Sequence, residues 1–248
     1  MPLKSEVRGV DDRLSVCRQK SLAALSTEAL LTELLSESEE FGRLAVVSSF
    51  GTESAVLLQQ IAKIAPETPV IFIDTLFHFD ETLAYRDALV EQLSLRDVRS
   101  LSIDPLSQKR LDPVRTLHLT DPDQCCHVRK VEVLRRALRG FDGWISGQKR
   151  YQSDTRAAIA RVEWDAVSDK WKFNPLADWT ADQIETYRDR HGLPRHPLAH
   201  LGYTSVGCAP CTSPVADHEH SRAGRWRGQQ KLECGLHRNP NIIAASAA

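Results

Sequence analysis

Residues 44–54 of the chain read Leu44-Ala45-Val46-Val47-Ser48-Ser49-Phe50-Gly51-Thr52-Glu53-Ser54. The stretch opens with an apolar run that contains two adjacent valines, which is typical of a strand buried on both faces of a parallel sheet. It then changes to small and polar residues, and the apolar segment at 55–64 predicts a helix directly after them. Strand, short turn and helix in this order predict the first unit of an α/β fold.

The same alternation continues along the chain. An apolar run predicts a strand at 70–73, the alternating segment Val98-Arg99-Ser100-Leu101-Ser102-Ile103 predicts another at 98–103, and a short strand is predicted at 143–146. Helical patterns lie between them at 81–93 and 128–138. Parallel strands joined by helices form right-handed crossovers, which give a parallel sheet flanked by helices. In such a sheet the ligand site is expected at the carboxyl ends of the strands.

The segments on either side of this region differ from it in pattern. Residues 1–43 predict amphipathic helices that pack on the core. Tryptophans around a Ser-Asp pair predict a β-hairpin at 162–173, and a capping-box start predicts a helix at 180–191. Beyond residue 192, proline, glycine and histidine dominate and no regular element is predicted.

The composition is that of an ordinary soluble globular protein. Of 248 residues, 42% are hydrophobic and 26% are charged, and the formal net charge is −1. This balance disfavours nucleic acid and anionic membrane surfaces as partners. The sequence contains no apolar run of about 18 residues and no secretory signal pattern, so we expect a cytoplasmic protein. In that reducing compartment, the six cysteines are expected to serve metal binding or catalysis rather than disulfides.

Ser49, Gly51 and Ser54 predict an anion-binding turn at the end of the first strand. Glycine allows a tight turn, the serines add hydroxyl donors, and the following helix directs its N-terminal N–H groups to the same place. The pattern lacks the lysine of a Walker A loop and the glycine spacing of a dinucleotide-binding fold. Asp74-Thr75 ends the next strand and would open onto the same crevice. We therefore expect a phosphate group there.

Four cysteines occur in two close pairs. Cys125 and Cys126 are adjacent at the start of a predicted helix, and Cys208-Ala209-Pro210-Cys211 begins 82 positions after the second of them. Four thiolates in two pairs fit either tetrahedral zinc or a 4Fe-4S cluster. The adjacent pair is an awkward fit to zinc, which favours the cluster. Lys130, one turn further on, would offset the negative charge of the thiolates.

The sixth cysteine in chain order lies close to the C-terminus. Residues 231–237 read Lys231-Leu232-Glu233-Cys234-Gly235-Leu236-His237 and follow a basic run of Arg222, Arg225 and Arg227. A lone thiol on a polar terminal segment is poorly placed for a core and well placed to react. Without further support it would be interpreted as an incidental surface cysteine.

Taken together, four motifs resemble the adenylylsulfate/phosphoadenylylsulfate reductase family, and specifically its assimilatory adenylylsulfate (APS) reductases with iron–sulfur cysteines. The motifs are Cys125-Cys126-His127-Val128-Arg129-Lys130, Gly207-Cys208-Ala209-Pro210-Cys211-Thr212, Arg222-Ala223-Gly224-Arg225-Trp226 and Glu233-Cys234-Gly235-Leu236-His237. The resemblance extends from about Val46 to His237. It implies a parallel α/β sheet of the adenine-nucleotide alpha hydrolase-like (PP-loop) type, in agreement with the strand and helix pattern.

The resemblance also implies roles for individual residues. Cys234 matches the catalytic nucleophile. The positions of the 4Fe-4S ligands are matched by Cys125, Cys126, Cys208 and Cys211. The substrate-binding positions are matched by Ser49, Gly51, Ser54, Lys130, Gly147, Arg150, Arg156, Arg222, Arg225 and His237. The phosphate loop departs from the Ser-Gly-Gly-x-Asp-Ser of related ATP pyrophosphatases, which is expected of an enzyme without Mg–ATP chemistry.

The implied reaction is the reduction of APS to sulfite and AMP in sulfate assimilation and cysteine biosynthesis. The Cys234 thiolate attacks the sulfate sulfur, AMP leaves, and thioredoxin or a glutaredoxin-like donor releases sulfite from the S-sulfocysteine. The expected partners are this donor and APS, with no nucleic acid and no membrane. A homo-oligomer is left open by the sequence.

These expectations divide the chain into three parts: an N-terminal helical region (1–43), an α/β nucleotide- and cluster-binding domain (44–215) and a C-terminal segment with the catalytic cysteine (216–248). Since Cys234 has to meet APS in a closed pocket and the donor outside it, we expect this segment to be mobile, with a hinge at about 223–231.

Three alternatives remain at the level of sequence. The substrate is phosphoadenylylsulfate (PAPS), or both nucleotides are used. Alternatively, the chain is a PP-loop ATP pyrophosphatase that thiolates tRNA, which the net charge of −1 disfavours. A non-enzymatic iron–sulfur or zinc module would leave the Ser49–Ser54 turn without a purpose.

Overall fold

A computed structural model of the protein describes residues 14–36 and 39–236. Its centre is a six-stranded sheet with the strand order β3-β2-β1-β4-β6-β5. The strands are β1 (Leu44–Val47), β2 (Val70–Ile73), β3 (Val98–Leu101), β4 (Gly143–Ser146), β5 (Val162–Asp165) and β6 (Lys170–Phe173). All neighbours are parallel except β5 and β6, which are antiparallel. The predicted parallel sheet and the predicted hairpin are thus confirmed.

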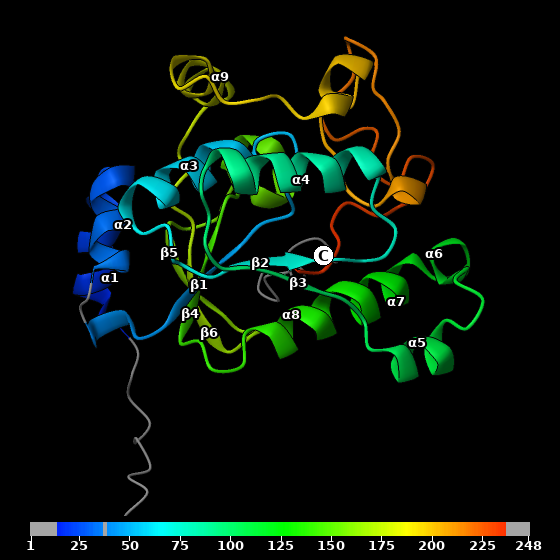
Figure 1. Ribbon diagram of the computed structural model, residues 1–248, viewed down its shortest axis with the longest axis horizontal. Coiled ribbons are helices and arrows are strands. Elements are labelled where there is room, and N and C mark those ends of the chain that lie inside the picture. Colours follow the sequence, from blue (N-terminus) through cyan, green and yellow to red (C-terminus); the bar gives the residue numbers. More distant parts are fainter. Residues whose placement is uncertain (1–13, 37–38, 237–248) are drawn as a thin grey trace, which may run out of the picture.

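Helices cover both faces of this sheet (Figure 1). The helices are α1 (Val16–Ala24), α2 (Thr27–Leu35), α3 (Ser54–Ile64), α4 (Asp80–Gln92), α5 (Pro105–Leu111), α6 (Leu117–Thr120), α7 (Pro122–Cys126), α8 (Glu132–Ala137) and α9 (Ala181–Arg190). In Figure 1, α3 and α4 lie above the sheet, and α8 lies below it. No helix of the described residues is both long and apolar enough to cross a membrane.

Side chains of the central strands alternate between two hydrophobic clusters. Val46 and Phe72 belong to a cluster that also contains buried residues of α2, α3 and α4. Their neighbours Ala45 and Ile71 belong to a second cluster, which includes residues of α8. This alternation is the period of two expected for a strand buried on both faces. It explains why the central strands are apolar without interruption.

The N-terminal helices pack directly on the α/β core. Ser15 and Ser26 accept hydrogen bonds from backbone N–H groups in the first turns of α1 and α2, so each helix has a side-chain N-cap. Leu30 and Leu31 of α2 are fully buried in the same cluster as the central strand β1. The predicted division at residue 43 therefore separates two parts that share one hydrophobic cluster, and the domain boundaries stay a prediction.

The largest difference from the predicted elements lies between residues 105 and 131. The short helices α5 and α6 were not predicted, and the helix expected from Val128 begins at Pro122. Proline in the first turn and an aspartate cap start both α5 and α7. A π-helical turn, His127–Val131, joins α7 to α8. The paired cysteines therefore lie at the end of the first helical piece rather than at its start.

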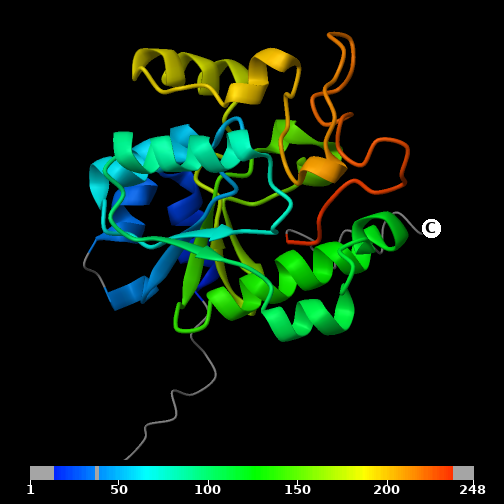
Figure 2. The same cartoon turned by 45° about the vertical axis from the view of Figure 1, so that its right-hand side comes forward.

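After α9 the chain leaves regular structure and returns to the sheet. A backbone bridge between Thr212 and Arg225, and a hydrogen bond from Ser213 N to the Gly224 carbonyl, fold residues 212–226 into a loop. The last described residues then run to the region between the sheet and the helices α7 and α8 (Figure 2). Leu236 packs against the cluster that contains α8 residues. The C-terminal segment is thereby brought next to the carboxyl ends of the strands.

Candidate active site

A cavity of about 210 Å³ opens at the carboxyl ends of β1, β2 and β4. The last residues of these strands, Val47, Ile73 and Ser146, lie in its wall. This is the position expected for a ligand site in a parallel sheet. Nine residues predicted to be catalytic or substrate-binding line it: Ser49, Gly51, Ser54, Lys130, Gly147, Arg156, Arg222, Arg225 and Cys234.

The predicted anion-binding turn forms one side of the cavity. The backbone of Phe50 has a positive φ of 47°, and its N–H donates to the Ser48 hydroxyl at 3.2 Å. This tight turn leads into α3, which is 11 residues long. The side chain at the N-cap, Glu53, gives no capping hydrogen bond. The first N–H groups of α3 are consequently not capped by it, as an anion site at a helix start requires.

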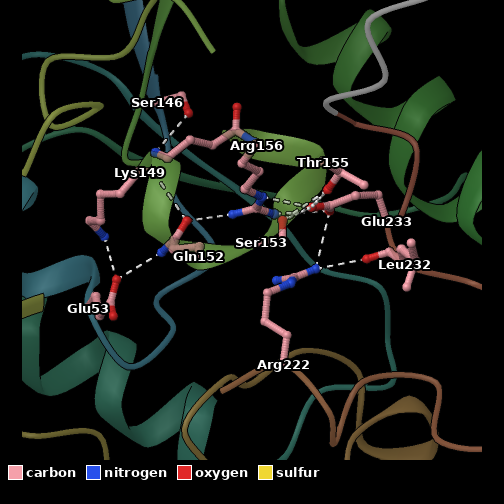
Figure 3. Close-up of polar contacts among 11 residues, drawn as sticks. Glu53, Ser146, Lys149, Gln152, Ser153, Thr155, Arg156, Arg222, Leu232 and Glu233 are labelled. Carbon is pink, nitrogen blue, oxygen red and sulfur yellow. Dashed lines mark hydrogen bonds and ion pairs between the residues drawn. The ribbon is translucent and has the colours of Figure 1, made fainter. Parts of the chain in front are cut away.

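The carboxylate of Glu53 is instead held by three donors from the turn after β4. Lys149 Nζ lies 2.7 Å and Gln152 Nε2 lies 2.8 Å from it (Figure 3). Tyr151 Oη lies 2.7 Å from the same carboxylate. Burial opposes ionisation of Glu53, but the positive charge and the hydrogen bond of Lys149, with those of Tyr151 and Gln152, hold its pKa below the ordinary value. Glu53 thus joins the phosphate-loop side of the cavity to the turn that contains Lys149.

A second carboxylate in the cavity wall, that of Glu233, lies between two arginines. Arg156 Nε donates to Glu233 Oε1 at 2.7 Å and its Nη2 donates to Oε2 at 3.0 Å. Arg222 Nη2 donates to Oε2 at 3.2 Å, so both guanidinium groups are directed at one carboxylate (Figure 3). Burial disfavours the ionised form of Glu233. The hydrogen bond and the charge of Arg156, together with the charge of Arg222, outweigh this effect and lower the pKa of Glu233.

Cys234 follows this carboxylate and is half-buried in the cavity wall. Gly235, the next residue, has a positive φ of 87°, a conformation that favours glycine. Lys130 is buried in the same wall, where burial disfavours its charge. The sulfur atoms of Cys208, Cys234 and Cys126 outweigh that effect and raise the pKa of Lys130 above its ordinary value. The Lys130 ammonium group therefore lies between Cys234 and the paired cysteines.

The four paired cysteines, Cys125, Cys126, Cys208 and Cys211, line one smaller cavity. Thr75 Oγ1 lies 3.2 Å from Cys208 Sγ. Burial raises the pKa of Cys125 to about 12 and that of Cys126 to about 11. Burial thus opposes ionisation of these two thiols, and a bound metal would offset it with positive charge. Burial opposes ionisation of Cys208 as well, but the charge of Lys130 and the hydrogen bond with Thr75 outweigh it and lower the pKa of Cys208.

Within residues 14–36 and 39–236, no group of three or more His, Cys, Asp or Glu side chains is arranged to hold a metal ion. Each cysteine of a 4Fe-4S cluster binds a different iron, so its sulfurs stand farther apart than the ligands of a single ion. Four thiols from two segments around one cavity, with the buried Arg129 and Lys130 in its wall, fit such a cluster in donor type and number.

Two predicted substrate residues are not part of the described cavity. Arg150 forms an ion pair with Asp178 and donates from Nε to the Ile159 carbonyl at 2.8 Å, and it does not line the cavity. Its neighbour Lys149 faces Glu53 instead. His237 lies outside the described residues.

Sequence reasoning also missed several residues of the cavity wall. Gln148 is buried with both ends of its amide lacking a hydrogen-bond partner, and His78 is buried in part with Nδ1 unpaired. His78 follows the strand end at Asp74, and Gln148 adjoins Gly147. Neither residue has a spacing that identifies it. His196, interpreted from sequence as a loop or surface residue, is fully buried against Thr82 and Tyr85.

Comparison with known proteins gives a match over most of the chain. Residues 43–214 match the family described as phosphoadenosine phosphosulfate reductase domain. An adenosine 5'-phosphosulfate reductase of Mesorhizobium japonicum is 47% identical over 194 residues, which cover 78% of this chain and 76% of the relative. A phosphoadenosine 5'-phosphosulfate reductase of Gloeobacter violaceus is 44% identical over 219 residues, which cover 86% of this chain and 89% of the relative.

Solved structures give the same fold. A phosphoadenylyl-sulfate (PAPS) reductase from Candida auris, in a phosphate complex, has a TM-score of 0.68 at 25% identity, covering 82% of this chain and 98% of that one. An FMN adenylyltransferase from Candida glabrata has a TM-score of 0.55 at 14% identity, covering 92% of this chain and 88% of that one. The second likeness concerns the fold alone, and it agrees with the predicted PP-loop type of sheet.

Proposed function

The chain belongs to the phosphoadenosine phosphosulfate reductase family, and on this premise we propose that it reduces APS to sulfite and AMP with Cys234 as the nucleophile. The observation that carries the proposal is the placement of the Cys234 side chain in the same cavity wall as three arginines and the Ser49–Ser54 turn. A thiol beside an anion-binding surface suits attack on a sulfate that is bonded to a phosphate.

APS is the preferred substrate in this proposal. Relatives from Mesorhizobium japonicum, Chelativorans and Streptomyces coelicolor are named adenosine 5'-phosphosulfate reductases, and the relative from Gloeobacter violaceus is named for the 3'-phosphorylated nucleotide. The resemblance of the two cysteine pairs to the iron–sulfur branch favours APS. PAPS reduction, or use of both nucleotides, is the second candidate, supported by the name of the Gloeobacter relative.

The first chemical step forms a bond between sulfur atoms. The Cys234 thiolate attacks the sulfate sulfur, the bond from that sulfur to the phosphate oxygen breaks, and AMP departs with the electron pair. The negative charges that meet in this step need cationic donors that are already in place. Lys130, Arg222 and Arg225 line the cavity beside Cys234 and supply them. AMP is a stable leaving group, so no strong general acid is required.

The second step returns the enzyme to its starting form. A thiolate of thioredoxin, or of a glutaredoxin-like donor, attacks Sγ of Cys234, the bond to the sulfonate sulfur breaks, and sulfite leaves. The mixed disulfide is then opened by the second thiol of the donor. The two electrons that reduce the sulfate sulfur thus come from one dithiol, which becomes a disulfide. We propose that this reaction serves sulfate assimilation in the cytoplasm.

The four paired cysteines Cys125, Cys126, Cys208 and Cys211 would hold the 4Fe-4S cluster. When bound, the cluster supplies a charged metal centre that tunes the electrostatics of the neighbouring site. Lys130 lies in the walls of both the cluster cavity and the substrate cavity, so it is placed to stabilise anions on either side. The Arg129 guanidinium is held in place by two hydrogen bonds: Nη2 donates to Asp112 Oδ2 at 2.7 Å, and Nη1 donates to the Thr75 carbonyl at 3.1 Å.

The replacement Cys234→Ser tests the assignment of the nucleophile. We expect sulfite formation from APS with thioredoxin to fall by at least about 10³-fold, because the hydroxyl is a far weaker nucleophile at neutral pH. Iron content of the anaerobically purified variant should remain at four per chain if the cluster is bound elsewhere, as proposed. Retained turnover would overturn the role of Cys234, and a colourless zinc protein with normal turnover would overturn the cluster.

Comparison of kcat/KM for APS and PAPS decides between the two substrates. A preference for APS of at least tenfold is expected. ATP-dependent adenylation of tRNA in place of sulfite formation would instead identify a PP-loop ATP pyrophosphatase.

A further inference from the structure

The carboxylate of Glu233 receives an unusual number of donors for a residue on a terminal segment. Besides the two bonds from Arg156 and the one from Arg222, the hydroxyls of Ser153 and Thr155 lie 3.4 and 3.3 Å from its Oε1. All five contacts come from side chains that are polar or positively charged. Only 12% of the Glu233 side chain is exposed, the same fraction as for each of the two arginines. The carboxylate therefore fills a prepared anion site.

The same two arginines line the substrate cavity. Burial and the charge of Arg156 disfavour protonation of Arg222, which the charge of Glu233 only partly offsets, and its pKa is lowered to about 10. Two guanidinium groups held this close repel each other, and an anion between them removes that repulsion. In the described residues Glu233 supplies this anion. A substrate with a phosphate–sulfate end carries more negative charge and more acceptor oxygens than one carboxylate.

We propose that Glu233 is a resident anion, which occupies the Arg156–Arg222 pair before substrate binds and is displaced from it by the phosphate–sulfate end of the nucleotide. The inference rests on the proposed function, since it concerns the anion that this cavity takes. It assigns to Glu233 a positioning role, because its carboxylate acts on the reaction through the two arginines and through its neighbour Cys234.

Displacement of Glu233 and movement of Cys234 are coupled through the chain. Glu233 directly precedes Cys234 in the chain. Arg222 also holds the backbone of this segment, because its Nη2 donates a hydrogen bond to the Leu232 carbonyl at 3.1 Å (Figure 3). Gly235 on the other side of Cys234 has the backbone freedom of a glycine. Before substrate arrives, the contacts of Glu233 keep Cys234 at the cavity. The incoming anion releases these contacts at the time when the thiol has to approach the sulfur.

Binding measurements test the proposal without turnover. In the Cys234→Ser background, Glu233→Gln removes the charge of the competitor and retains its size. We expect calorimetry to show APS bound about tenfold more tightly and inorganic sulfate bound more tightly as well, because neither has to displace a carboxylate. Adenosine, which has no anion, should bind equally to both proteins. Glu219→Gln is the matched control, since Glu219 pairs with Arg227 on the same segment outside the cavity.

The reactivity of the thiol gives a second measurement in the otherwise unaltered chain. With Glu233→Gln, alkylation of Cys234 by iodoacetamide should be several-fold faster in the absence of ligand, because the segment is held less firmly. The exposed Cys17 is an internal reference within each sample. Equal or weaker binding of both APS and sulfate to the folded Glu233→Gln protein would show that Glu233 is a structural partner of the arginines and overturn the proposal. Loss of APS reduction in the parent protein would instead count against the proposed function, while the sulfate titration would still test the resident anion.

Discussion

At the scale of single residues, the sequence did not identify the acidic side chains of the cavity as part of the site. Motif resemblance identified residues that contact substrate in the family, and it identified none of their partners. Glu53 is held by Lys149, Tyr151 and Gln152, and Glu233 by the arginine pair. A carboxylate that neutralises a cation has no characteristic spacing along the chain. Its role depends on which side chains the fold brings within hydrogen-bond distance, here from almost 100 residues away for Glu53.

The replacement Glu53→Gln should destabilise the protein at neutral pH. Lys149 is 3% exposed, and without the carboxylate its ammonium group would be a buried charge with no anion. We expect a loss of about 3 kcal/mol in the free energy of unfolding. Denaturant unfolding followed by circular dichroism measures it. Asp97→Asn, which removes an exposed pair with Arg99, is the control and should cost less than about 1 kcal/mol.

The pH dependence of this loss has a defined sign. The pKa of Glu53 is below its ordinary value of 4.5 in the folded protein, so its contribution to stability is fully present above pH 4.5. The contribution decreases as the pH falls through the folded pKa, because the native carboxylate is then protonated. The difference between the parent protein and Glu53→Gln should therefore shrink on acidification below pH 4.5. A difference that stays constant down to pH 3 would contradict the assignment of Glu53 as an ionised partner of Lys149.

At the scale of elements, the loop before the second cysteine pair fixes the place of a predicted substrate residue. A Cβ atom at Gly207 would lie 2.2 Å from Nη2 of Arg225 and 2.5 Å from its Cζ. The Arg225 guanidinium stacks on Trp226, with 4.6 Å from Cζ to the ring centroid, and lines the cavity. A side chain at position 207 would therefore displace the Arg225 guanidinium from its present place.

The replacement Gly207→Ala is expected to affect binding more than folding. The arginine is flexible at its far end and can move aside, so the free energy of unfolding should change by less than about 1 kcal/mol. APS affinity should fall tenfold or more, because a hydrogen bond to a charged group contributes about 1.5 to 3 kcal/mol. In an Arg225→Ala background, Gly207→Ala should have no further effect on affinity. Equal losses with and without Arg225 would refute this explanation.

The elements that could be predicted are those whose pattern is fixed by burial. The strands at 44–47, 70–73 and 143–146 are close to the predicted ranges, because a strand covered on both faces is mostly apolar. The strand at 98–101 is only partly buried and was predicted from its alternating pattern. The short helices α5 and α6 have no buried residues, so no apolar period marks them. The direction of Arg150 also could not be predicted, because it depends on Asp178 across the turn.

At the scale of the whole molecule, the N-terminal helices pack on the core without forming any of the cavity wall. Leu31 is fully buried in the cluster that joins the N-terminal helices to the sheet, and the cavity wall contains no residue of α1 or α2. Leu31→Ala should lower the free energy of unfolding by about 2 to 5 kcal/mol. At a temperature where the variant remains folded, kcat/KM for APS should be unchanged. Leu106→Ala, at a position that is 80% exposed, is the control and should leave stability almost unaltered. A large fall in kcat/KM for folded Leu31→Ala would show that the N-terminal helices shape the cavity.

The wide separation of the two cysteine pairs along the chain has a consequence during synthesis. Cys126 and Cys208 are 82 residues apart, and both pairs are needed to enclose one cavity. At translation rates of about 5 to 20 residues per second, the first pair waits roughly 4 to 16 seconds for the second. For this time two adjacent thiols are present in a half-made cavity, open to oxygen and to stray metal ions. Cys234 is the last of the six cysteines to be translated, so it joins the protein only after both pairs are present.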